Sequence, residues 1–359
     1  MKNKAVVLLI LTMLLGGVSS VMANTNSNRQ EVKIFEDPKK LIYDAGFKTP
    51  NGNDIKIFDP GKSRASITMY DNIVYSKVKA PLKDQDIELK MSIVTKLGNS
   101  EMKNATGSSD PNDVVNRKPV IIYVNGGGFR GADKNQMVPE MQYLADAGYA
   151  VAFVYYRSSA EAIFPAQIID VKSAVRYLRA NADKYGINPN KIGITGRSAG
   201  GSLVALACMN LPGYDEGDNL EFSSDVQFGV DMFGPVDFKD LMDFDRSNFS
   251  PTSRWKKDAD THGGAFLGGS YENMPEKFRE ASPVFQVNAK TAPMLILHGD
   301  ADPLVPYRQS IAMYDAMKAA GKKVDFYLIK GAGHGTDEFW QESTRVLCLK
   351  YFDKYLKNE

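Results

Sequence analysis

The sequence has few of the residues that build metal sites and disulfide frameworks. Its 359 residues include only 2 cysteines and 3 histidines. These are widely spaced along the chain, which argues against a Cys/His metal site. We therefore expect no metal and no cofactor, and we expect Cys208 and Cys348 to be two buried thiols within helices.

The sequence also lacks an excess of charge of either sign. Its 44 Lys and Arg residues nearly balance 43 Asp and Glu residues, for a net charge of +1, and no basic block stands out. Such a chain generates no long-range field toward nucleic acid, so we expect no nucleic-acid partner. No internal repeat is visible. A hydrophobic content of 43% is typical of a globular protein with a large core, and α/β folds of this length often form one domain.

The one conspicuous apolar run lies at the N-terminus and is short for a membrane span. Lys2 and Lys4 precede apolar residues 5–11, and Val21-Met22-Ala23 ends a stretch of small residues. This arrangement is typical of a signal peptide, here residues 1–23, with an uncleaved anchor as the alternative. We expect a secreted or periplasmic protein that has no membrane partner after cleavage.

The remainder divides into a polar N-terminal extension, residues 24–66, and a catalytic domain, residues 67–359. Two strand-like runs open the domain, and from Pro119 near-continuous apolar strands alternate with amphipathic helices. That alternation predicts an α/β fold with a mostly parallel sheet and helices on both faces. The pattern breaks over residues 238–281, which we interpret as a small inserted cap on which His262 is expected to be exposed.

The most informative segment is KIGITGRSAGG, in which Ser198 stands between Gly196 and Gly200. A G-x-S-x-G pattern alone is weak evidence, but this one joins a buried strand to the start of an apolar helix pattern. In so sharp a turn the flanking residues must be small, because a Cβ atom would collide with the neighbouring strand and helix. The turn exposes Ser198 as a candidate nucleophile; an incidental serine in a glycine-rich turn is the alternative.

A nucleophilic serine needs a base and a carboxylate that orients the base. His334 follows the last predicted strand in KGAGHGTDEF and is the expected base. His298 ends the preceding strand, where a structural role is favoured. The segment HGDADPLVP offers Asp300 and Asp302, and Asp302 is preferred because it lies further into the loop.

Three glycines in YVNGGGFRGADK follow the first predicted parallel strand. Glycine lets the backbone approach a ligand closely and turn its amides inward. We expect the amides of Gly127 and Gly128, with that of Ala199, to form an oxyanion hole. A phosphate-binding loop is the alternative, but the segment lacks the Lys-Ser/Thr ending of that motif.

Together these motifs resemble the α/β-hydrolase superfamily, and within it the lipase/esterase branch of hormone-sensitive-lipase-like enzymes and bacterial acetyl xylan and feruloyl esterases. Four collinear blocks carry the similarity across most of residues 119–355: NGGGFRGADK, the segment from FPAQ to SAGG, the segment from SPVF to LVPY, and GAGHG. The chain order Ser198, Asp302, His334 is the α/β-hydrolase order. The resemblance implies a serine carboxylesterase acting on a small-molecule or oligosaccharide ester, with acetyl or feruloyl groups on plant polysaccharide as expected substrates.

Two positions depart from the family pattern. Asn125 stands where the family usually has histidine, and its amide can still donate a hydrogen bond that shapes the glycine loop. Arg197 precedes the serine, and a structural salt bridge is favoured over recognition of an anionic or sugar-rich substrate.

Three other functions fit parts of the pattern. A prolyl-oligopeptidase-type serine peptidase shares the fold, but too few residues precede PVIIYV for its propeller domain. A non-catalytic binding module would be expected to have lost one of the three polar residues. A general short-chain lipase or esterase also remains open.

Overall fold

The computed structural model describes residues 42–48, 54–58, 66–96, 117–131, 133–248 and 257–358. Contacts divide the chain into two units, Met1–Arg64 and Ala65–Glu359. In the first unit, β1 (Ile42–Lys48) and β2 (Asp54–Phe58) pair as an antiparallel hairpin. The predicted signal peptide and most of the predicted extension lie outside the described residues.

The second unit is built on an eight-stranded sheet with the order β10-β9-β8-β7-β5-β6-β4-β3. The strands from β5 to β10 pair in parallel, and β4 pairs antiparallel with both β3 and β6. Their bounds are β3 (Ile67–Ala80), β4 (Gln85–Lys96), β5 (Lys118–Val124), β6 (Ala150–Val154), β7 (Ile187–Arg197), β8 (Phe228–Met232), β9 (Met294–Gly299) and β10 (Val324–Ile329).

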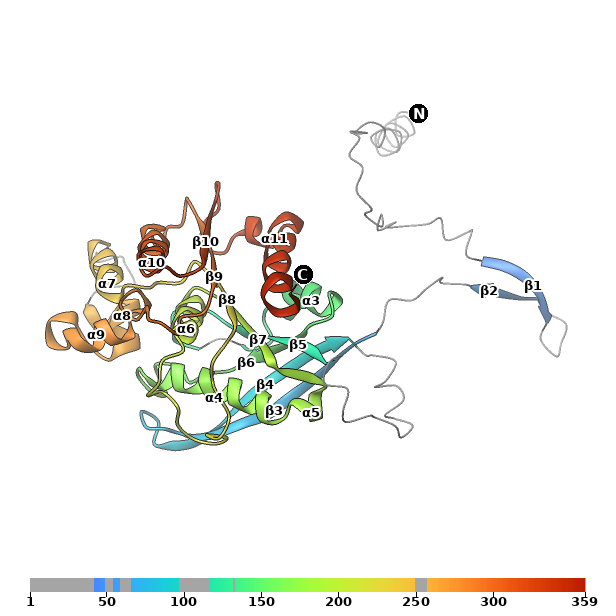
Figure 1. The fold of residues 1–359 in the computed structure, drawn as a ribbon, viewed down its shortest axis with the longest axis horizontal. Coiled ribbons are helices and arrows are strands. Elements are labelled where there is room, and N and C mark those ends of the chain that lie inside the picture. Colours follow the sequence, from blue (N-terminus) through green and yellow to red (C-terminus); the bar gives the residue numbers. More distant parts are fainter. Residues whose placement is uncertain are drawn as a thin grey trace, which may run out of the picture. The chain divides into compact units, whose positions relative to one another are not determined.

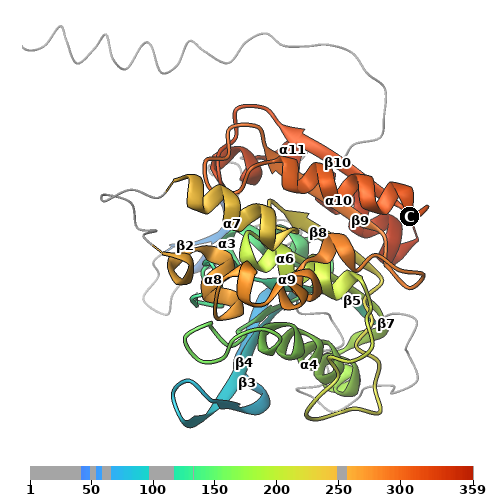
Figure 2. The same cartoon turned by 90° about the vertical axis from the view of Figure 1, so that its left-hand side faces the viewer.

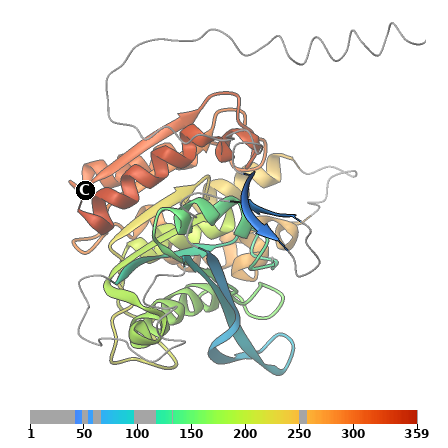
Figure 3. The ribbon, with the colours of Figure 1, turned by 90° about the vertical axis from the view of Figure 1, so that its right-hand side faces the viewer.

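Helices cover both faces of this sheet, which confirms the predicted α/β-hydrolase fold class (Figure 1). On one face lie α4 (Ala166–Ala180), α6 (Ala199–Cys208) and α10 (Arg308–Ala319), in front of the sheet in Figure 2. On the other lie α3 (Val138–Asp146) and α11 (Glu342–Phe352), the latter drawn in red in Figure 3. The central strands are buried on both sides, and every residue of β6 is buried. That explains why they read as continuous apolar runs rather than as alternating ones.

Shorter elements complete these layers. Asn181 separates α4 from the short α5 (Ala182–Tyr185). The C-terminal segment forms η6 (Asp337–Trp340), α11 and the π-turn η7 (Asp353–Lys357). Cys208 and Cys348 are both buried free thiols, as expected.

The segment predicted to be a cap forms a group of short helices beside α6 and α10 (Figure 1). It contains α7 (Phe238–Ser247), η3 (Asp258–Asp260), α8 (His262–Leu267), η4 (Tyr271–Asn273) and α9 (Pro275–Ala281), and η5 (Pro283–Phe285) leads back to β9. Phe266 is fully buried, and Phe244 is half-buried under the guanidinium of Arg308. Phe249 and Trp255 lie outside the described residues. Among the described residues, no helix combines the length and the apolar character needed to cross a membrane.

Candidate active site

The topology brings the predicted site segments to one edge of the sheet. The glycine loop, residues 125–131, follows β5, and Ser198 follows the adjacent strand β7. Asp302 and His334 follow the neighbouring strands β9 and β10. Because these strands are parallel, their carboxyl ends share an edge, where ligands bind in open α/β sheets.

The turn around Ser198 is as crowded as the sequence predicts. Ser198 has φ 53° and ψ −126°, a strained conformation for a residue with a side chain. A Cβ on Gly196 would lie 2.6 Å from the Val124 carbonyl oxygen, and one on Gly200 would lie 2.6 Å from that of Asn125. Real Cβ atoms do not approach so closely, so only glycine lets α6 pack against the end of β5 while it holds Ser198 out into the pocket.

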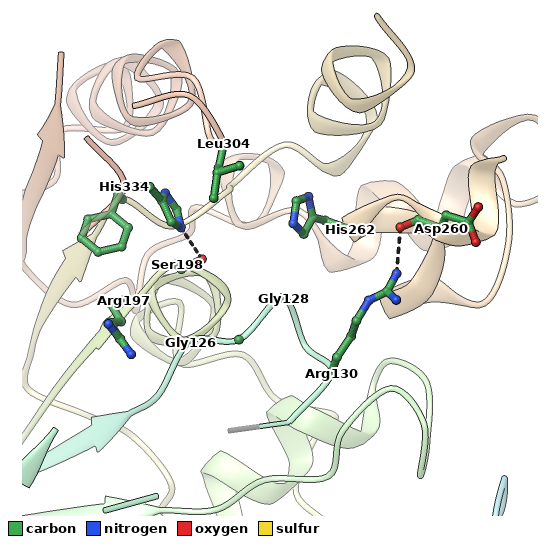
Figure 4. A pocket seen from close by; sticks show the side chains of 11 residues that line it. Gly126, Gly128, Arg130, Arg197, Ser198, Asp260, His262, Leu304 and His334 are labelled. Atoms are coloured by element: carbon green, nitrogen blue, oxygen red, sulfur yellow. Dashed lines mark hydrogen bonds between the residues drawn. The ribbon is translucent and has the colours of Figure 1, made fainter. Parts of the chain in front are cut away.

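Ser198, His334 and Asp302 lie in one hydrogen-bonded line (Figure 4). His334 Nε2 is 2.8 Å from Ser198 Oγ, and His334 Nδ1 is 2.7 Å from Asp302 Oδ2. A carboxylate can only accept, so Nδ1 carries the proton and Nε2 presents a lone pair to the serine hydroxyl. This arrangement can remove a proton from Ser198 Oγ.

Asp302 is held by the rest of its loop. Its side chain is fully buried, and Oδ1 accepts hydrogen bonds from the amides of Leu304 and Val305 at 2.8 and 3.0 Å. Burial alone would raise the pKa of Asp302, but hydrogen bonds from His298 and His334 outweigh it and hold that pKa below its usual range. The carboxyl is therefore ionised wherever His334 is to act as a base.

His298 has the structural position that the sequence favoured. It is fully buried, with Nε2 2.8 Å from the Val305 carbonyl oxygen and 3.3 Å from Asp302 Oδ2. Since both neighbours are acceptors, Nε2 carries the proton, and Nδ1 can accept from the Ser310 hydroxyl at 2.7 Å. Asp300 instead accepts the Gly331 amide at 2.6 Å on the exposed side of the loop.

The glycine loop runs directly beside the nucleophile. A Cβ on Gly126 would lie 3.1 Å from Ser198 Cβ, and Gly126, Gly127 and Gly128 all line the pocket. Gly127 and Gly128 have φ values of 122° and 59°, which side chains rarely allow. The buried Ala199 is the first residue of α6, so its amide has no preceding helical turn to bond. The three expected oxyanion donors thus border Ser198.

Asn125 organises this loop, as its amide was expected to do. Its Nδ2 donates to the Asp133 carbonyl at 2.6 Å, and its Oδ1 accepts from the Gly126 amide at 3.0 Å. The same Oδ1 lies 3.3 Å from Arg197 Nε, and Arg197 Nη2 donates to Gln136 Oε1 at 3.0 Å. The salt bridge favoured for Arg197 is wrong within the described residues, where its guanidinium contacts the amides of Asn125 and Gln136 and lies near the Tyr123 hydroxyl.

The expectation that His262 is exposed is also wrong. Its side chain is only 15% exposed, and it lines the pocket with Ser198 and His334 (Figure 4). The fully buried Asp245 of α7 accepts the His262 backbone amide at 2.9 Å and lies 3.1 Å from its Nδ1. A Cβ on Gly128 would lie 3.3 Å from His262 Cδ2, so this cap residue closes against the glycine loop.

Aromatic packing fixes the cap to the glycine loop. Phe129, which follows the glycines at φ 60°, stacks on Phe266 with ring centroids 3.9 Å apart. Phe238 and Phe164 pack on the same Phe266 ring at 5.0 and 5.4 Å. Beside them, Arg130 Nη2 donates to the Asp260 carbonyl at 2.7 Å.

The resulting pocket has a volume of about 460 Å³. Sequence reasoning missed several residues of its wall: Arg130, Phe233, Asp260, His262 and Leu304. Phe233 follows β8 at φ 46° and packs edge-on against His334 with centroids 4.7 Å apart. Its position after a strand, within DMFGP, was the available signal. Among the described residues, no group of three or more His, Cys, Asp or Glu could hold a metal ion.

Comparison with known proteins agrees with this geometry. The model of the BD-FAE family matches residues 110–317, more than half of the chain. The chain belongs to the BD-FAE family. This BD-FAE family member is 32% identical over 223 residues to esterase LipC of Mycobacterium tuberculosis, a match that covers 61% of the chain and 53% of LipC. The chain thus spans about half the length of the curated relatives it matches.

Similar solved structures cover a larger share of the chain than these curated relatives do. A truncated carbohydrate esterase from gut microbiota shares 29% identity at a TM-score of 0.64, covering 83% of this chain and 99% of the other. A bifunctional GH43-CE protein of Bacteroides eggerthii shares 26% identity at a TM-score of 0.63, covering 84% of this chain and 36% of its own. The predicted resemblance to the esterase branch is confirmed, and the matched domain is a carboxylic ester hydrolase domain.

Proposed function

We propose that the protein is an exported serine carboxylesterase that releases acyl groups through an acyl-enzyme. The observation that carries this proposal is the hydrogen-bonded line from Ser198 through His334 to Asp302, which opens into a pocket beside the glycine loop. Ser198 is the nucleophile, His334 the general base and then acid, and Asp302 the group that orients His334.

In acylation, His334 Nε2 takes the proton from Ser198 Oγ as Oγ attacks the ester carbonyl carbon. The carbonyl oxygen becomes an oxyanion, stabilised by the amides of Gly127, Gly128 and Ala199. Loss of one such donor costs about 2.7–4 kcal/mol in the transition state. His334 then protonates the leaving alcohol, and the carbon–oxygen bond to the alcohol breaks.

In deacylation, water takes the place of the alcohol. His334 Nε2 accepts a proton from the water as the water oxygen attacks the acyl carbonyl, and the same amides hold the second oxyanion. The proton returns to Ser198 Oγ as the acid departs, which restores the starting state. This chemistry requires no cofactor.

Acetyl or feruloyl groups on plant polysaccharide or oligosaccharide are the proposed substrates. Membership of the BD-FAE family and similarity to a protein described as a carbohydrate esterase support this assignment. A pocket of about 460 Å³ exceeds what an acetyl group fills and falls within the usual range for small-molecule sites. The acyl and sugar parts can therefore both contact the wall.

Export is proposed from residues 1–23 alone. If the signal peptide is cleaved, mass spectrometry of the protein recovered outside the cytoplasm will find a chain that begins near Asn24. An intact Met1 on that protein would contradict cleavage.

The function is tested with purified mature protein and its Ser198→Ala variant. The wild type is expected to hydrolyse 4-nitrophenyl acetate and to release acetate or ferulate from acetylated and feruloylated xylan, identified by mass spectrometry. The variant is expected to lose these activities. No wild-type turnover of any ester between pH 6 and 9 would refute the proposal, and cleavage of a dipeptide nitroanilide instead would indicate a peptidase.

A further inference from the structure

Two arginines line the pocket on opposite sides of Ser198 (Figure 4). Arg197 directly precedes the serine, and Arg130 follows the glycine loop. Each carries a cationic guanidinium group, which can only donate hydrogen bonds. Their partners decide whether that charge is neutralised inside the protein or presented to a ligand.

Arg197 contacts amides rather than acids. Its Nε lies 3.3 Å from Asn125 Oδ1 and its Nη2 donates to Gln136 Oε1 at 3.0 Å. No carboxylate of the described residues forms an ion pair with it. Two neutral amide oxygens orient the guanidinium without cancelling its charge, and the planar fork retains donors for a bidentate partner.

Arg130 likewise contacts a neutral group rather than an acid. It is exposed, and its Nη2 donates to the backbone carbonyl of Asp260 at 2.7 Å, whereas the Asp260 carboxylate points away from it (Figure 4). Within the part of the chain that the structure describes, Arg130 has no ion pair. Around the serine, the wall therefore presents cationic donors on both sides.

We propose that this pocket selects ester substrates that carry a carboxylate, and that Arg197 binds this carboxylate on the alcohol part of the substrate. The proposal rests on the esterase function proposed above. Uronic acid residues of an acidic oligosaccharide have the required chemistry: a planar carboxylate close to an esterified hydroxyl. Arg130 lies farther along the pocket and contributes attraction at longer range.

The position of His334 assigns the carboxylate to the alcohol. His334 must protonate the leaving oxygen, so the alcohol lies on its side of Ser198. In Figure 4, His334 lies above and to the left of Ser198 and Arg197 below and to the left, while Gly128, His262 and Arg130 extend to the right. A Cβ on Gly126 would lie 3.4 Å from Arg197 Cγ, so the arginine stem packs under the glycine loop beside the reacting carbonyl.

The test uses two matched substrates: an acetylated glucuronoxylan oligosaccharide and the same oligosaccharide after reduction of its uronic carboxyl to an alcohol. A hydrogen bond to a charged group is worth enough to change kcat/KM roughly tenfold to a hundredfold. We expect wild type to prefer the acidic form by about tenfold or more, with the preference shrinking as ionic strength rises. Arg197→Gln should reduce that preference to within about twofold, and Arg197→Lys should retain part of it.

Arg279→Gln is the matched control, because it removes an arginine of the cap that does not line this pocket. It should keep the wild-type preference. Equal wild-type activity on both oligosaccharides would overturn the proposal, as would an equal loss on both in Arg197→Gln, which would make the arginine a support for the glycine loop only.

A second pair, mono-4-nitrophenyl succinate and its methyl ester, places the carboxylate on the acyl group. If Arg197→Gln changes selectivity only for this pair, the assignment to the alcohol part is wrong. Calorimetry with Ser198→Ala and the two oligosaccharides gives a readout independent of turnover. Tighter binding of the acidic form supports the site even if the wild type hydrolyses no ester, which would refute the esterase function alone.

Discussion

Replacement of Gly200 by alanine tests how tightly the turn around Ser198 is built. Gly200 belongs to α6, where alanine is favoured over glycine by roughly 0.5–1 kcal/mol. The added methyl group would lie 2.6 Å from the Asn125 carbonyl oxygen and closer still to that of Val124. Both are backbone atoms at the end of a central strand, so α6 must retreat by on the order of 1 Å to restore an ordinary contact distance.

That retreat should affect rate more than stability. Overpacking costs typically about 1–3 kcal/mol, partly offset by the gain in helix propensity, so we expect Tm to fall by roughly 2–8 °C. Ser198 begins the same helix and would shift away from His334 Nε2, now 2.8 Å from its Oγ. A misplacement of about 1 Å can cost a hundredfold in rate, so we expect kcat for 4-nitrophenyl acetate to fall by about that factor.

Gly148→Ala provides the control. Gly148 has φ 94° with nothing within 4 Å of the added Cβ, so this substitution strains the backbone without crowding. We expect a loss of stability of about 1–2 kcal/mol with kcat retained. Thermal unfolding and steady-state kinetics of both variants separate the two effects. Wild-type kcat and Tm in Gly200→Ala would refute the steric account of the turn.

Three further substitutions test other parts of the site. Asp302→Asn should lower kcat by about 10⁴-fold with little change in KM, because an amide does not hold His334 in the required tautomer; a loss below tenfold in steady-state kinetics would contradict this. Asp245→Asn should lower the free energy of unfolding by about 1–3 kcal/mol in urea titrations, because the carboxylate that holds His262 is fully buried; unchanged stability would argue against it. Burial raises the pKa of Asp231 to about 6, so the folded state favours the protonated form, and the stability of the wild type falls as pH rises from about 4 through 6. Asp231→Asn removes that dependence, so its free energy of unfolding relative to wild type should rise by about 1–1.5 kcal/mol between pH 5 and 8, read out as a growing difference in Tm. A difference that is independent of pH would show that Asp231 does not titrate in this range.

The sequence predicts the layered sheet and the chain order of the triad because both depend on local patterns. In the sequence, strands β5 to β10 are apolar runs separated by segments with the apolar periodicity of a helix. Ser198, Asp302 and His334 each follow such a run. Parallel strands end at one edge of a sheet, so residues after several strand ends are brought together once the fold is known. The tight turn at Gly196 and Gly200 follows from the same local reasoning.

The part of the pocket wall that the cap contributes could not be predicted, because it depends on how the cap packs against the rest of the domain. His262 faces Ser198 only because Asp245, on a different helix, fixes its ring, and no spacing in the sequence couples these two residues. One hydrogen-bond partner of Arg197 is Gln136, which lies 61 positions away in the sequence and follows another strand. Such contacts are set by tertiary packing rather than by periodicity.

The stack of Phe129 on Phe266 has an evolutionary consequence. The residue that follows the glycines is locked into the cap core, so a change in the cap that admits a new substrate also tilts the amides beside the reacting carbonyl. Mutations in the cap that change substrate selectivity therefore also change the catalytic rate of this protein. Variants selected for a larger acyl or sugar group should first lose speed on the old ester, and compensating changes should appear in the buried rings rather than at the triad.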